Sequence, residues 1–204
     1  MIENFVRPPH TTVDIVADAL RVIGVLSVLV AGIGWSLTDA GILAFVLPGL
    51  VAPRFLGVRA GFDITSSVSL LIAGWSNVSD LYTTVDWWDV PIHLVCTGVV
   101  SALAYLLLAE LGIVAAPRVH GVRVIAPVVL TTVVGLAMSA VWEMVEWLGR
   151  TFITAQIFVT YDDTIGDMAM GGLGSIIAGV LLATVRLVRE PALDGGRTPA
   201  SMHH

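Results

Sequence analysis

Apolar runs long enough to span a bilayer alternate with short polar stretches along the whole chain. A helix needs about 20 mainly apolar residues to cross the hydrocarbon core of a membrane. The runs therefore predict six spanning helices, over residues 16–35, 38–53, 64–82, 89–113, 124–148 and 164–188. The second run is short and contains Pro48, which removes a helical hydrogen bond, so a kinked, tilted or re-entrant helix is left open there.

The composition indicates a membrane location. Of the 204 residues, 56% are hydrophobic and only 13% are charged, and the mean hydropathy is +0.90. Soluble domains carry about 25% charged residues. We expect an all-α, polytopic membrane helix bundle, with one transmembrane domain over residues 1–190 and a flexible cytoplasmic tail over residues 191–204. Membrane lipids are its expected partners, a homo-oligomer or a membrane partner stays open, and the scattered arginines argue against nucleic acid.

The arginines predict the orientation of the bundle. If all six helices cross, all but one of the ten cationic residues lie on one side of the membrane, namely Arg7, Arg21, Arg54, Arg59, Arg118, Arg123, Arg186, Arg189 and Arg197. Arg150 lies on the other side. The positive-inside rule makes the arginine-rich side cytoplasmic. Both termini are therefore expected in the cytoplasm, and this pattern also supports the weak second span.

Six ionisable residues form three pairs inside the apolar chain. The members of each pair are three or four residues apart, so they share one face of a helix. The topology places all three pairs at the outer ends of the last three helices, which short connections make neighbours. The pairs are Asp89 with His93, Glu143 with Glu146, and Asp163 with Asp167.

This cluster predicts a cation site. Five carboxylates and one imidazole cannot all stay ionised in a low-dielectric environment unless protons or cations compensate them. A single ion held by the histidine with two or three acids suits Zn, Fe or Mn, whereas a pair of ions among oxygens suits Mg, Mn, Fe or Ca. We therefore expect one or more divalent metal ions of open identity at Asp89, His93, Glu143, Glu146, Asp163 and Asp167.

Some members of the pairs have a simpler explanation. Asp89 could cap the helix that it begins, and Glu146 could form an ordinary exposed ion pair with Arg150. Asp163 could be an acid of a first helical turn, where the helix dipole favours it. Asp167 lies deeper in an apolar run, and Glu143 lies near a helix C-terminus, which disfavours anions. Ion binding explains these last two best.

Other recurring residues point to ordinary structural roles. Asp14, Asp18 and Arg21 share one helical face and are expected to form a solvated surface with an internal ion pair. In the last helix, Gly171, Ser175 and Gly179 recur every four residues, which allows another helix to approach closely. The tryptophans gather near the outer ends of the helices, as in an aromatic belt, at Trp35, Trp75, Trp87, Trp88, Trp142 and Trp147.

Three motifs contain the polar pairs: Trp-Asp-Val-Pro-Ile-His at 88–93, Trp-Glu-Met-Val-Glu-Trp at 142–147 and Asp-Thr-Ile-Gly-Asp-Met at 163–168, followed by Gly171 and Gly174. In this order and spacing, over the C-terminal two thirds of the chain, the sequence resembles the YjdF-like family of bacterial inner-membrane proteins. The resemblance implies a multi-pass inner-membrane protein of poorly defined activity. It also implies a further acid where this chain has Thr160, so either Asp162 substitutes or the ligand set differs.

Two classes of function fit these residues, and the sequence does not decide whether the protein is an enzyme. The first is a membrane-embedded, metal-dependent hydrolase that acts on a lipid-linked or phosphorylated substrate. The second is a small cation or proton-coupled transporter, and an accessory membrane subunit is a third option. The pairs gather near one membrane surface, and no matching polar residues were identified toward the cytoplasm. This asymmetry favours the hydrolase.

Overall fold

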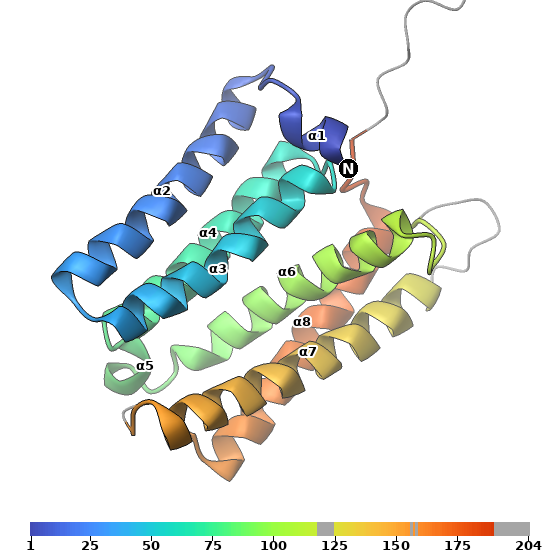
Figure 1. Cartoon of the computed structure of the whole chain (residues 1–204). Helices are drawn as coiled ribbons and strands as arrows, with labels where there is room; N and C mark the ends of the chain where they lie inside the picture. Colours follow the sequence, from blue (N-terminus) through green and yellow to red (C-terminus); the bar gives the residue numbers. More distant parts are fainter. Residues whose placement is uncertain (118–124, 156, 158, 190–204) are drawn as a thin grey trace, which may run out of the picture.

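The computed structural model describes residues 1–117, 125–155, 157 and 159–189, and this part of the chain is all-helical (Figure 1). Within it, the only pairing of extended residues is an isolated bridge between Val58 and Val188. The helices are α1 (Ile2–Val6), α2 (Thr12–Gly34), α3 (Leu37–Phe55), α4 (Ala60–Val78), α5 (Leu81–Thr84), α6 (Asp89–Glu110), α7 (Ile125–Phe152) and α8 (Tyr161–Thr184). The all-α prediction is confirmed. The predicted tail at 191–204 lies outside the described residues.

Polar caps set where several helices begin. Thr11 caps α2 and forms a reciprocal capping box with Asp14. Ser36 caps α3 by accepting a hydrogen bond from the backbone N–H of Asp39. Such caps satisfy backbone donors that the first helical turn leaves unpaired. The doubtful second run is helical from Leu37 to Phe55, with Pro48 inside it.

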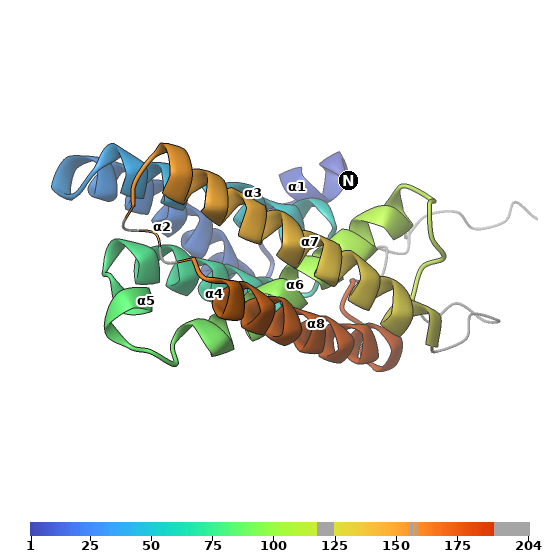
Figure 2. The same cartoon turned by 90° about the horizontal axis from the view of Figure 1, so that it is seen from below.

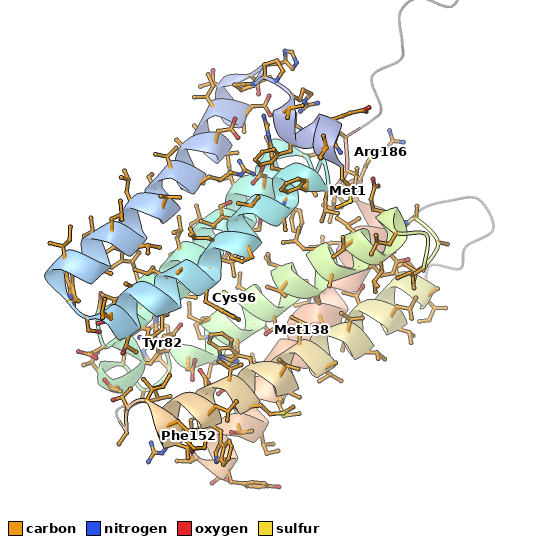
Figure 3. All side chains as sticks on the ribbon, viewed as in Figure 1. Met1, Tyr82, Cys96, Met138, Phe152 and Arg186 are labelled. Carbon is orange, nitrogen blue, oxygen red and sulfur yellow. The ribbon has the colours of Figure 1, made fainter. Side chains whose placement is uncertain are left out.

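The long helices form two groups of three, α2–α4 and α6–α8, which lie side by side (Figures 1 and 2). Contacts between α4 and α6 join the groups. The short helix α5, which contains Tyr82, lies at one end of the bundle, and Phe152 lies at the same end (Figure 3). We call this the α5 end. Met1 and Arg186 lie at the opposite end, called the terminal end. All three predicted polar pairs therefore lie toward the α5 end.

Five of the described helices are long and apolar enough to cross a membrane: α2, α3, α6, α7 and α8. The remaining long helix, α4, has 19 residues but is more polar. It carries Asp63 and several serines, of which Ser66, Ser67 and Ser76 are buried inside the bundle. Because the polar residues of α4 face the interior of the bundle, this helix packs among the other long helices although it is less hydrophobic than they are.

Small residues bring α6 and α8 into close contact. A Cβ atom at Gly174 would lie 1.9 Å from the carbonyl oxygen of Leu94, and one at Gly98 would lie 2.8 Å from the carbonyl oxygen of Gly174. A Cβ atom at Gly179, which is also on α8, would lie 2.6 Å from Cα of Val128 on α7. The predicted packing role of small residues in the last helix is thus confirmed. The close approach fixes α6, α7 and α8 as one unit.

Ion pairs tie the terminal end together. Arg21 pairs with Asp63 at 2.6 Å and with Asp18 at 2.9 Å. Asp14 is 3% exposed and pairs with Arg189. The predicted ion pair within this face is confirmed and joins Asp18 to Arg21, but the prediction of a solvated face is wrong for Asp14, which is buried. Asp14 and Asp63 are buried because charged partners from distant segments neutralise them.

Candidate metal centre

Helix α6 contributes the first pair of the site, Asp89 and His93, on successive turns. Trp88 is the N-cap residue of α6, and Asp89 is its first helical residue. Asp89 is therefore not the capping residue, although it remains an acid of the first turn, where the helix dipole favours it. Its Oδ1 lies 3.1 Å from Nε2 of His93, so the carboxylate faces the histidine.

His93 is the residue on which the three helices converge. Its side chain is 7% exposed. Nε2 lies 3.9 Å from Oδ2 of Asp167 on α8, and Nδ1 lies 4.0 Å from Oε1 of Glu143 on α7. The two ring nitrogens therefore face carboxylates on opposite sides, and each of α6, α7 and α8 contributes at least one of these groups.

Five of the six predicted residues fall into two overlapping groups with the spacing of metal ligands. Asp89, His93 and Asp167 form one group, and His93, Glu143 and Glu146 form the other. Within each group, one ligand atom from every residue lies within 4.8 Å of the others. A neutral imidazole offers one nitrogen lone pair. His93 can therefore serve one ion, and a second ion would depend on oxygen ligands alone.

The buried carboxylates of the site are not satisfied by the described residues. Both side-chain oxygens of Glu143 and Oδ2 of Asp167 are buried and make no hydrogen bond of normal geometry to the described residues, although the Thr164 side chain lies close to Glu143. Glu143 is 6% exposed and Asp167 is 4% exposed. An unpaired buried polar group costs free energy, and an unpaired buried charge costs far more. These oxygens therefore have the chemistry of cation ligands.

Glu146 is oriented by a neighbour on its own helix. The indole Nε1 of Trp142 donates a hydrogen bond of 2.8 Å to Oε1 of Glu146. Arg150 donates to the carbonyl oxygen of Ile157 instead. The exposed ion pair considered for Glu146 and Arg150 is therefore absent from the described contacts. Hydrogen bonds of this kind orient the carboxylates that ligate metals.

Asp163 is the predicted ligand that the structure does not bring into either group. It lies in the first turn of α8, and its backbone N–H donates to Oγ1 of Thr160, the N-cap residue. Its side chain is half-buried, one turn nearer the α5 end than Asp167. Thr160, where the resemblance implied a further acid, thus has the role of a helix cap here.

Hydrogen bonds to α4 hold the start of α6 and the short helix α5 in place, and the spacing of charges did not predict them. Trp88 donates from Nε1 to Oγ of Ser76 at 2.8 Å, and the Tyr82 hydroxyl donates to the carbonyl oxygen of Ala73 at 3.1 Å. Burial raises the pKa of Tyr82 above its ordinary value, so the phenol stays a neutral donor.

Comparison with known proteins places the chain in a family without assigning an activity. No curated protein and no solved structure matches it. A family model described as "Predicted membrane protein (DUF2238)" matches residues 18–187. This match includes all six predicted site residues and confirms the resemblance found in the three motifs. The chain therefore belongs to the predicted membrane proteins of the DUF2238 family, which is the YjdF-like family.

Proposed function

We propose that this protein binds a divalent metal ion between α6, α7 and α8, in the outer half of a bacterial cytoplasmic membrane. One observation carries the proposal: buried carboxylate oxygens of Glu143 and Asp167 lie within 4.0 Å of His93, and these oxygens make no hydrogen bond of normal geometry to the described residues. Charged residues inside membrane bundles typically mark functional sites. In this proposal all six long helices cross, α4 included, and the positive-inside rule keeps both termini cytoplasmic.

The ligands are His93 and the carboxylates on either side of it. One ion takes a ring nitrogen of His93 with oxygens from Glu143 and Glu146, or with oxygens from Asp89 and Asp167. The set mixes one imidazole with carboxylates, which suits Mn, Fe or Zn for that ion. A second, oxygen-only position suits Mg, Mn, Fe or Ca. Asp163, one turn away, is a candidate for moving protons to or from the site rather than for ligation.

The activity we infer is metal-dependent hydrolysis of a lipid-linked or phosphorylated substrate. A bound divalent ion polarises a phosphoryl or carbonyl oxygen and lowers the pKa of a bound water. A carboxylate that is not needed as a ligand can then act as a general acid or base. The location near one end of the bundle supports this activity, because a headgroup at the membrane surface can reach it.

Elemental analysis of detergent-purified protein tests the metal centre. Wild-type protein is incubated with Mg, Mn, Fe(II), Ca or Zn, freed of excess metal without a chelator, and compared with Glu143→Gln and Asp167→Asn. We expect about one bound divalent ion per chain in the wild type and a loss of that ion in both variants. Asp86→Asn is the matched control, because Asp86 is an exposed acid at the same end of the bundle. Wild-type protein that retains none of the five metals would contradict the proposal.

Transport of the cation is a second candidate, and one observation favours it. Thr131 and Ser139 lie on the buried face of α7 that also presents Glu143, and neither hydroxyl has a hydrogen-bond partner among the described residues. Their hydroxyl groups form a line of buried polar groups on α7 that runs from the site toward the terminal end. Uptake of labelled Mn²⁺ into proteoliposomes, lost in Ser139→Ala with metal binding retained, would favour transport over hydrolysis. Metal binding without uptake would favour the hydrolase.

A further inference from the structure

A cavity of about 320 Å³ lies between α7 and α8 on the α5 side of the bundle. Its walls are mainly apolar, and they are formed by Ala140, Glu143, Met144, Trp147, Val159, Thr164 and Met168. The two helices run next to each other over this region (Figures 1 and 2). The volume falls within the range of about 300–1,000 Å³ that is typical of small-ligand sites.

The cavity opens sideways, onto the surface that faces lipid. Met144 is 56% exposed and Trp147 is 54% exposed, although both belong to an apolar helix of spanning length. Helix α7 has 28 residues, which corresponds to about 42 Å at 1.5 Å per residue. This exceeds a hydrocarbon core of about 30 Å. Trp147, near its end, thus lies at headgroup level, with Met144 and Ala140 progressively deeper.

The inner end of the cavity is part of the metal centre. Glu143 lines the cavity and belongs to the ligand group with His93 and Glu146. Its carboxylate oxygens are themselves buried, so a ligand in the cavity would lie beside Glu143 and would reach these oxygens only through an ion bound to them. Thr164 adds a hydroxyl from α8, three residues before Asp167. An apolar passage with an ionisable inner end matches an amphiphile, which carries an apolar chain and a polar headgroup.

We propose that this cavity admits the hydrocarbon chain of a phosphate-bearing membrane lipid from the side, with the headgroup beside Glu143 and the metal ligands. The chain packs against Ala140, Met144 and Met168, and Trp147 lies at the mouth. This inference rests on the proposed metal centre, because an anionic phosphate approaches a cluster of carboxylates only when a cation lies between them. Under this inference, the substrate of the proposed hydrolase is a phosphate-bearing lipid that enters the cavity directly from the membrane.

Photo-crosslinking in vesicles tests this inference on the wild-type protein. The protein is reconstituted with Mn²⁺ in phosphatidylcholine vesicles that contain a trace of phosphatidate carrying a diazirine in one acyl chain. The matched probe is diacylglycerol with the same chain. Mass spectrometry then compares labelling of Met144, Trp147 and Met168 with labelling of Leu26 and Leu29, which face lipid on α2. We expect labelling of the cavity residues to be enriched for phosphatidate alone and lost on chelation of the metal.

Two variants separate this inference from the metal centre. Ala140→Phe fills the cavity without touching a ligand, and we expect it to lose the enriched labelling and keep its bound metal. Ala137→Phe, at an exposed position of the same helix, should keep both. Bound metal with equal labelling of α2 and the cavity would overturn the lipid inference and leave the metal centre standing. Enriched labelling by both probes in a protein without metal would overturn the metal centre and the headgroup assignment together.

Discussion

At the scale of single residues, the carboxylate of Glu143 would determine how the proposed site responds to metal. Glu143 is buried next to other carboxylates, and its oxygens make no hydrogen bond of normal geometry to the described residues. A buried anion without a partner destabilises the folded protein, whereas a bound cation reverses that cost. Glu143 should therefore destabilise the folded protein without metal and stabilise it when metal is bound.

This reversal gives a stability prediction for Glu143→Gln. In chelator, we expect the variant to unfold at a higher temperature than the wild type, because a neutral amide replaces a buried carboxylate. Metal at 100 times its dissociation constant should stabilise the wild type by about 2.7 kcal/mol and the variant far less. Thermal unfolding in detergent, with and without metal, measures both effects. A variant stabilised by metal as strongly as the wild type would remove Glu143 from the site.

Residue spacing predicted which side chains share a helix face, and the order of the helices predicted that three such pairs come together. The spacing of Asp89 and His93 predicted their contact, and five of the six predicted residues lie in the two ligand groups. The pairing of Arg21 with Asp63 went unpredicted, because a sequence does not reveal which turns of two distant helices meet. Asp163 shares a face with Asp167, but it lies one turn closer to the start of α8, outside both groups.

At the scale of helices, the close approach of α6 and α8 positions the site. These helices carry Asp89, His93 and Asp167, and glycines allow their backbones to touch below those residues. Without this approach, His93 and Asp167 would not lie within 3.9 Å of each other. The packing of the helices and the geometry of the ligands are therefore linked.

Gly174→Ala tests this link. The added methyl group would overlap the carbonyl oxygen of Leu94, so α6 and α8 must separate at a cost of about 1–3 kcal/mol. We expect a lower midpoint of unfolding and weaker metal binding, measured on the same preparation. Gly166→Ala on the same helix has no atom within 4 Å of the new methyl group and should keep wild-type metal affinity. Equal metal affinity in the two variants would show that the close approach is unnecessary for the site.

Apolar runs predicted the long helices well but not their ends. Helix α2 begins at Thr12 rather than at 16, and α8 begins at Tyr161 rather than at 164, because polar caps and first turns lie outside the apolar run. Helix α4 ends at Val78 rather than at 82, and Asp80 follows with a φ of 57°. The hydrophobicity of a segment predicts which residues lie within the membrane, whereas the ends of a helix depend on local hydrogen bonds.

At the scale of the whole molecule, the bundle has two chemically different ends. The terminal end carries a network of arginines and aspartates around Arg21, Arg54 and Arg189. The α5 end carries the carboxylates around His93. The positive-inside rule assigns the arginine-rich end to the cytoplasm. The metal centre would then face the outside of the cell.

Cysteine labelling in intact cells tests this orientation. In a Cys96→Ser background, Asp86→Cys reports the α5 end and Ile113→Cys reports the terminal end, since both positions are exposed. We expect a membrane-impermeant maleimide to label Asp86→Cys in intact cells and Ile113→Cys only after permeabilisation. The reverse pattern would place the metal centre in the cytoplasm. Labelling of both positions in intact cells would contradict the crossing of α6, which separates the two positions in the chain.

His93 and the carboxylates around it are proposed to hold a divalent ion. Electron spin echo envelope modulation of Mn²⁺-loaded protein tests this binding. This measurement detects a nitrogen bound to Mn²⁺. We expect modulation from a single imidazole in the wild type, its loss in His93→Gln, and its persistence in His10→Gln, since His10 is exposed and its backbone N–H donates to Asp14 at the terminal end. Wild-type protein that binds no Mn²⁺, or nitrogen modulation that survives in His93→Gln, would contradict the proposed centre.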